Sequence, residues 1–261
     1  MSKVMSFAEA AQAIPAATVP VNVEATPVVA ETQSLAPAVR RAGVVANPNA
    51  DISGEWERKE LKIPELSIVQ KVGGLADNFP FSSIVLNKEY ILSDGKTPIT
   101  LTVLRIDKSY EEIVEYGSDV RARTVGTLAE VHRLGGTIAK SEDAAGNEIE
   151  ASWRPIAKAL VCIHGSDADA QSVFFPYEQD GKAFAFALWT MRGVAYSRAA
   201  TFIRTAGDFA YRAGLSTGTF RLGTKTEKFN QNSFAAPVMS FGSKNTPEFR
   251  TWVASFNTNS E

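Results

Sequence analysis

Cysteine and histidine are almost absent from this sequence. Cys162 is the only cysteine, and His132 and His164 are the only histidines. A disulfide within the chain and a cysteine-based zinc cluster are therefore excluded. Because Cys162 stands in the apolar run Ala-Leu-Val-Cys-Ile, we expect it to be a small, buried core residue. A lone thiol of this kind fits the reducing cytoplasm.

Long apolar segments are also lacking. No stretch approaches the roughly 18 consecutive apolar residues of a membrane-spanning helix. Glu9, Gln12 and Pro15 interrupt the region where a signal peptide would have its apolar segment. We therefore expect neither export nor membrane association, and we place the protein in the cytoplasm.

Motifs typical of catalysis are missing too. The chain has no Gly-x-x-x-x-Gly-Lys-Ser/Thr phosphate loop and no Gly-x-Ser-x-Gly nucleophile motif, and its two histidines lie far apart. An acidic cluster of Asp107, Glu111, Glu112 and Glu115 has the ligand type that gathers Mg²⁺ in a nuclease. The simpler interpretation is a solvated strand or turn. We predict no enzyme, no catalytic or metal-binding residue, and no cofactor.

Aromatic residues are scarce in the N-terminal segment, where proline is frequent. Phe7 is the one aromatic residue among residues 1–50, and the prolines are Pro15, Pro20, Pro27, Pro37 and Pro48. Such a segment buries too little apolar surface to offset the entropy lost on ordering. We expect residues 1–55 to be a disordered tail, available to a protein partner, and residues 56–261 to form one β-rich domain.

Alternating apolar residues in that domain predict strands over 99–106, 157–163, 182–190, 217–225 and 233–241. In the third of these, the alternation places Phe184 and Phe186 on one side and Trp189 on the other. An apolar stripe predicts a helix over 194–213, with Gly214 as its stop. Pro237 indicates an edge strand, and a short helix is expected from Pro247.

Basic and aromatic residues gather in the last third of the chain. Residues 181–261 hold ten Lys/Arg and four Asp/Glu, for a charge of about +6, whereas the remainder has 17 − 25 = −8. The same segment holds fourteen aromatic residues. Single-stranded nucleic acids need cations for their phosphates and flat rings for their bases. The alternative is that the charges pair within the fold and most of the rings belong to the core.

Three strands, a helix and two strands are the element order of the OB-fold, which binds oligonucleotides. Over residues 60–245 the chain resembles, in architecture and not in a sequence signature, the OB-fold single-stranded DNA-binding proteins of bacteriophages. The resemblance implies a mainly β (α+β) fold with one long helix, in the form of a five-stranded OB-like barrel with insertions. It also implies sequence-tolerant binding of single-stranded DNA in phage DNA replication or recombination, in the host cytoplasm.

Several alternatives stay open beside this resemblance. RNA instead of DNA, and a homo-oligomer, are compatible with the sequence. Bacterial proteins of this function usually end in an acidic tail, which the final residues Asn257 to Glu261 do not form, so recruitment of partners by that route is in doubt. A structural or scaffolding protein, for example of a virion, is the main rival, and a metal-dependent nuclease is the next.

The residues expected to bind nucleic acid are cations for phosphate and rings for base stacking. The segment from Lys225 to Phe234 is expected to be a polar loop between the last two strands, where a ligand would cover Phe229. The complete set is Trp189, Arg192, Tyr196, Arg198, Arg212, Arg221, Lys225, Lys228, Phe229 and Phe234.

Overall fold

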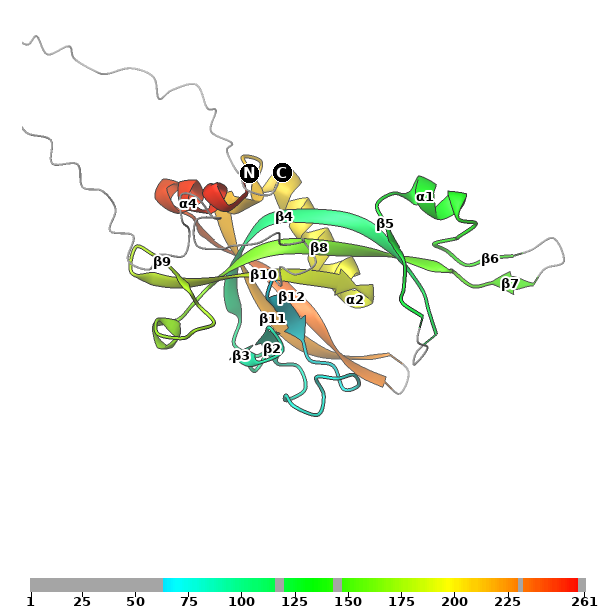
Figure 1. The fold of residues 1–261 in the computed structure, drawn as a ribbon, viewed down its shortest axis with the longest axis horizontal. Coiled ribbons are helices and arrows are strands. Elements are labelled where there is room, and N and C mark those ends of the chain that lie inside the picture. Colours follow the sequence, from blue (N-terminus) through cyan, green and yellow to red (C-terminus); the bar gives the residue numbers. More distant parts are fainter. Residues whose placement is uncertain (1–62, 116–119, 143–146, 230–231, 258–261) are drawn as a thin grey trace, which may run out of the picture. The chain divides into compact units, whose positions relative to one another are not determined.

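β-Strands are the main regular elements of the computed structural model, which describes residues 63–115, 120–142, 147–229 and 232–257 (Figure 1). The expected tail, residues 1–55, lies outside these ranges. All five expected strands are present and several run further than the sequence indicates: β4 (Ile99–Glu112), β8 (Trp153–His164), β10 (Lys182–Arg192), β11 (Gly218–Phe229) and β12 (Asn232–Lys244). The prediction of a mainly β fold is confirmed.

The sheet that contains these strands has ten members, so the five-stranded form of the expected barrel is not confirmed. Its main path runs β12-β11-β4-β8-β10-β1-β2-β3, and β5 and β9 pair with β4 and β10. The additional strands are β1 (Glu65–Ile68), β2 (Ile84–Leu86), β3 (Tyr90–Ser93), β5 (Thr124–Val125) and β9 (Tyr177–Gln179). β1 pairs with β10 in parallel. It therefore occupies the edge of β10 that five strands alone would leave unpaired.

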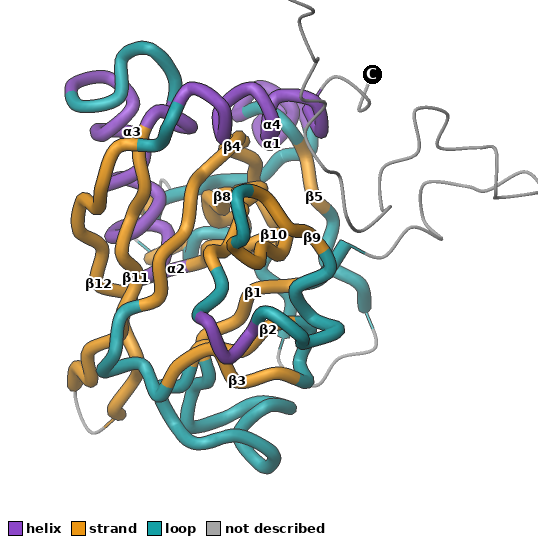
Figure 2. The backbone as a smooth tube through the Cα atoms, turned by 90° about the vertical axis from the view of Figure 1, so that its left-hand side faces the viewer, coloured by secondary structure: helices purple, strands orange, loops and turns teal. Residues whose placement is uncertain are grey.

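The sheet curls into an open half-barrel (Figures 1 and 2). Gln70, just after β1, donates through Nε2 to the carbonyl of Ala235 and accepts from its N–H through Oε1, both at 3.0 Å. Ala235 belongs to β12, at the far end of the sheet path. The side-chain amide therefore makes the bonds that another strand would make to this edge. Pro237 lies in β12, which is the edge strand that the proline indicates.

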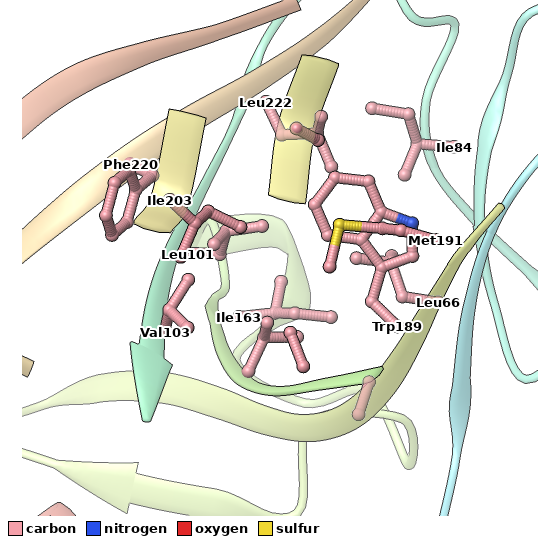
Figure 3. Close-up of a cluster of buried hydrophobic side chains, with 14 of the residues drawn as sticks. Leu66, Ile84, Leu101, Val103, Ile163, Trp189, Met191, Ile203, Phe220 and Leu222 are labelled. Atoms are coloured by element: carbon pink, nitrogen blue, oxygen red, sulfur yellow. The ribbon is translucent and has the colours of Figure 1, made fainter. Parts of the chain in front are cut away.

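The hydrophobic core fills the inner side of the curled sheet (Figure 3). Leu101 and Val103 of β4 and Ile163 of β8 point into it, and Ile203 covers them from the helix that follows β10. The alternation expected in β10 is confirmed: its alanines and Trp189 face this core, whereas Phe184 packs in a second cluster on the opposite face.

The helix expected over 194–213 is shorter than predicted and is not uniform. It consists of α2 (Gly193–Ala195), a π-helical turn (Tyr196–Ala200) and α3 (Thr201–Phe209). It ends before Gly214 because the chain folds back at Tyr211, whose hydroxyl donates to the carbonyl of Thr219 at 2.9 Å. Packing of this ring on Phe220, at 5.2 Å between ring centroids, outweighs helix propensity at this end.

Smaller elements fill the connections. The segment between β4 and β8 carries β5, the helix α1 (Leu128–Arg133) and a separate hairpin of β6 (Ser141–Glu142) and β7 (Glu148–Ile149). Single 3₁₀ turns cover Asp167–Asp169 and Leu215–Thr217, and α4 (Pro247–Asn257) follows β12, as expected from Pro247. Within the described ranges, none of the helices has the length and apolarity needed to cross a membrane.

Candidate nucleic-acid interface

Trp189, which the sequence suggests as a stacking ring, is a core residue. Its side chain is 2% exposed and belongs to the same buried cluster as Leu66 and Met191 (Figure 3). The expectation assumed that the strand ends at residue 190 and leaves the ring accessible. β10 instead continues to Arg192, and Trp189 pairs with Ala159 of β8. This correction removes Trp189 from the candidate interface.

The segment from Lys225 to Phe234, expected to be a polar loop, belongs instead to a β-hairpin. Pairing of β11 with β12 continues through Lys225 and Ala236 to the last pair, Phe229 and Asn232. β4 pairs with β11 only at residues 220–222, so the rest of the hairpin is a two-stranded ribbon (Figure 1). Exposed positions of β11, among them Lys225, Thr226 and Lys228, account for the polar composition, whereas Ala235 and Ala236 of β12 are buried. Phe234 is half-buried, and the side chain of Phe229 lies outside the described part of the structure.

The predicted cations of the hairpin are accessible. Arg221, Lys225 and Lys228 are exposed on β11 and form no salt bridge with any other described residue. Arg198, in the helical segment, forms a salt bridge at 2.7 Å with Glu227 of β11. This salt bridge connects the helical segment to the hairpin.

Two predicted residues remain: Tyr196 lies near the start of the helical segment, and Arg212 lies in the turn that follows α3. Tyr196 is half-buried, and Arg212 is exposed and donates through Nε to the backbone carbonyl of Asp208 at 3.1 Å. The predicted residues are therefore distributed over the helical segment, the hairpin and the sheet, and they do not form one patch.

Four cations from three neighbouring strands share the outer side of the sheet, opposite the core. Cross-strand pairing places Arg105 of β4 beside Leu160 of β8, and Lys158 of β8 beside Thr190 of β10. Residues paired in this way project to the same side of a sheet. We call this surface the β8–β10 outer face; its cations and their accessible neighbours are Arg105, Arg154, Lys158, Leu160, Leu188, Thr190 and Arg192. The same pairing places the carboxylates of Asp107 and Glu111 and the buried side chain of Ile156 on this side.

Two of these arginines are held by one carboxylate, that of Glu111. Its Oε2 accepts from Arg154 Nη2 at 2.7 Å and from Arg192 Nε at 2.8 Å, and its Oε1 accepts from Arg192 Nη2 at 2.6 Å. The Glu111 side chain is 8% exposed, whereas the arginines are 45% and 47% exposed. The bonds from Arg192, and then those from Arg154, lower the pKa of Glu111 to about 2. Both guanidiniums are thus fixed in orientation, and no other described residue accepts from their remaining N–H donors, which can bind an anion.

Arg105, Arg154 and Lys158 were not among the residues expected from the sequence. The sequence does contain an indication for two of them. Arg154 and Lys158 are an even number of positions away from Leu160 and Cys162, so in one strand all four side chains project to the same side of the sheet. The strand expected over 157–163 begins too late to include Arg154. Lys158 forms no salt bridge within the described ranges, and Arg105 pairs with exposed Asp107 at 2.8 Å.

A cavity of about 360 Å³ adjoins the β8–β10 outer face. Its lining includes Leu188, Thr190 and Arg192 of β10 together with Glu65 and Gln70, and the buried Trp189 also borders it. Its size is within the roughly 300–1,000 Å³ of small-molecule sites, and Arg192 places a cation in its wall.

The far end of the same sheet side is aromatic and is covered by α4. Phe184 lies 5.2 Å from Phe249 and 5.1 Å from Trp252 between ring centroids. Cys162 is fully buried in this cluster, as expected, and burial raises the pKa of its thiol. His164 lies in the same region, bonded to Thr102 at 2.9 Å, and burial lowers its pKa to about 4.

The acidic cluster expected as a rival nuclease site does not converge. Glu111 binds Arg154 and Arg192, Glu112 pairs with Arg123 at 2.7 Å, and Asp107 pairs with Arg105. Within the described ranges, no group of three or more His, Cys, Asp or Glu residues is arranged to hold a metal ion.

Comparison with known proteins identifies no relative of this chain. No protein-family model, no curated protein and no solved structure matches it.

Proposed function

We propose that the protein binds single-stranded nucleic acid, most simply single-stranded DNA, with little sequence preference. The observation that carries the proposal is the β8–β10 outer face, where cations from three adjacent strands lie among accessible apolar side chains. Backbone phosphates need such cations, and bases or sugars can lie against side chains such as Leu160 and Leu188, which are partly exposed.

The connectivity supports this choice of surface. β4, β8 and β10 precede the helix and β11 and β12 follow it, and the five strands are neighbours in the sheet. This is the element order of an OB-like barrel, to which β1, β2 and β3 would be an addition. In OB-folds the face of the second and third strands binds oligonucleotides, together with the loops between strands one and two and between strands four and five. Those strands are here β8 and β10.

The proposal predicts a specific salt effect at the outer face. Changing Arg105 and Lys158 together to glutamine should weaken oligo-dT binding and reduce the slope of log Kobs against log salt by about 1.4, since each lost phosphate contact on a single strand contributes about 0.7. Both side chains point away from the core, so the melting temperature should be nearly unchanged.

A matched control removes the same charge elsewhere. Lys71 and Lys96 are exposed in the loops next to β2 and β3, and their double change to glutamine should leave the slope as in the wild type. Equal slopes for the two double variants would place the phosphate path away from the β8–β10 outer face.

A further inference from the structure

A second cavity lies beside Tyr196, on the core side of the sheet and away from the β8–β10 outer face. It has a volume of about 340 Å³ and is lined by residues of β4, β8 and the helical segment: Ile106, Lys108, Ala157, Tyr196, Ala200, Thr201 and Arg204. We call it the Tyr196 pocket. A smaller cavity of about 170 Å³ shares Ile106 and Arg204 with it and is also lined by Tyr211 and Arg212, so the two cavities lie next to each other along α3.

The floor of the Tyr196 pocket is formed by small apolar side chains. Ala157 and Ala200 are buried, and their small side chains leave space above them beside Ile106. Tyr196 forms a wall, and its ring packs against the edge of the main core cluster. A planar ring can lie against such a floor and stack on the tyrosine, which is the arrangement that binds bases of single strands.

Local backbone structure fixes the position of Tyr196. The residue begins the π-helical turn, in which the hydroxyl of Thr201 donates to the carbonyl of Tyr196 at 3.4 Å. A π-turn takes up one more residue than an α-turn, and such turns occur frequently at functional sites. Tyr196 begins this wider turn and Thr201 follows it, and both residues line the Tyr196 pocket.

Two cations stand at the pocket. Lys108 Nζ lies 5.2 Å from the centroid of the Tyr110 ring; its pKa is raised, chiefly by Tyr110 and also by Tyr196, so it remains an ammonium at neutral pH. Arg204 is 74% exposed, and it pairs at 2.8 Å with Asp208 one helical turn on. An exposed pair of this kind contributes little stability, so a phosphate can take the place of the carboxylate.

We propose that the Tyr196 pocket binds one nucleotide of a single strand, with the base against Tyr196 and the alanine floor and the adjoining phosphate between Lys108 and Arg204. An inorganic anion would leave the apolar floor unused, and an acidic peptide brings no flat ring to the tyrosine. The adjacent cavity lined by Arg212 offers space for the next phosphate of the strand. This inference rests on the proposed function and assigns it a binding position apart from the outer face.

The test uses the full-length chain and oligo-dT containing 5-iododeoxyuridine, which cross-links to neighbouring aromatic side chains on irradiation. We expect the cross-link at Tyr196, identified by mass spectrometry of the digested complex. Tyr196→Leu, which keeps an apolar side chain against the core, should weaken oligo-dT binding roughly 5- to 150-fold without changing the salt slope. Lys108→Gln should instead reduce that slope by about 0.7.

Phe209→Leu is the matched control, because Phe209 is an exposed ring on the same helical segment and does not line the pocket. Its oligo-dT affinity should equal that of the wild type. Binding of oligo-dT by Tyr196→Leu at wild-type affinity, with cross-links elsewhere, would overturn the pocket alone. If the wild type binds dTMP as tightly as oligo-dT, the site is one for free nucleotides and the assignment to a strand is wrong. A wild-type chain that binds no single strand would overturn both this inference and the proposed function.

Discussion

Replacing Trp189 by alanine is expected to lower the free energy of unfolding by about 3–5 kcal/mol, the range for large aromatic residues removed from a core. The ring is 2% exposed and lies among the side chains of the inner face of the sheet. Its removal leaves a cavity that neighbours such as Met191 and Leu66 fill only in part. Urea unfolding followed by circular dichroism measures the change.

The control for this prediction is an exposed ring. Phe209 is 72% exposed, so Phe209→Ala should change stability by no more than about 0.5 kcal/mol. The structure also predicts that folded Trp189→Ala keeps its affinity for oligo-dT. A variant with wild-type stability and strongly reduced oligo-dT affinity would show that Trp189 stacks on bases, as the sequence alone suggests.

Replacing Glu111 by glutamine is expected to have the second largest effect. The pKa of Glu111 is lowered from 4.5 to about 2 in the folded protein, so the carboxylate stabilises the fold at pH values above 4.5. This contribution is lost as the pH falls through 2, and it amounts to at most about 3 kcal/mol, from about 1.4 kcal/mol for each pKa unit. Glu111→Gln should therefore be less stable than the wild type at pH 7, and the difference should shrink as the pH falls toward 2.

The same variant should bind single strands more tightly. The change removes the negative charge that pairs with Arg154 and Arg192, so the net charge of the β8–β10 outer face rises by one. We expect higher oligo-dT affinity and a steeper salt dependence than in the wild type. Glu178→Gln, at an exposed position of β9, removes the same charge as a control. If the two variants have equal stability across the pH range, the arginines do not depend on Glu111.

The strands and the helix were predictable from the sequence because their apolar residues repeat with a clear period. In β10 the alternation of alanine and phenylalanine is unbroken, and the two sets of side chains project to opposite sides of the sheet as expected. The ends of the elements were less predictable. The helix stops at Phe209 because Tyr211 packs on Phe220, and these two residues are brought together only by the tertiary fold.

The candidate interface was predictable only in part. Because the cations and rings lie close together in the sequence, they suggested one patch formed by the C-terminal third of the chain. In the folded sheet, the cations of the β8–β10 outer face come instead from strands that are distant in the sequence. Arg105, Arg154 and Lys158 belong to β4 and β8, and no local pattern connects them with Arg192 of β10. Tyr196 was among the rings that the sequence suggested for base stacking. The pocket around it depends on Lys108 and Ala157, which only the folded sheet places nearby.

A titration of wild-type protein with fluorescein-labelled oligo-dT, followed by anisotropy at several salt concentrations, tests the central claim most directly. The oligonucleotide should have about 20 nucleotides, longer than the ~4–16 nucleotides bound by one OB-fold, and a duplex of equal length serves for comparison. We predict tighter binding of the single strand, with log Kobs falling against log salt at a slope of about −2 to −3 for three or four neutralised phosphates. Absence of binding at low salt, or equal affinity for the duplex, would contradict the claim.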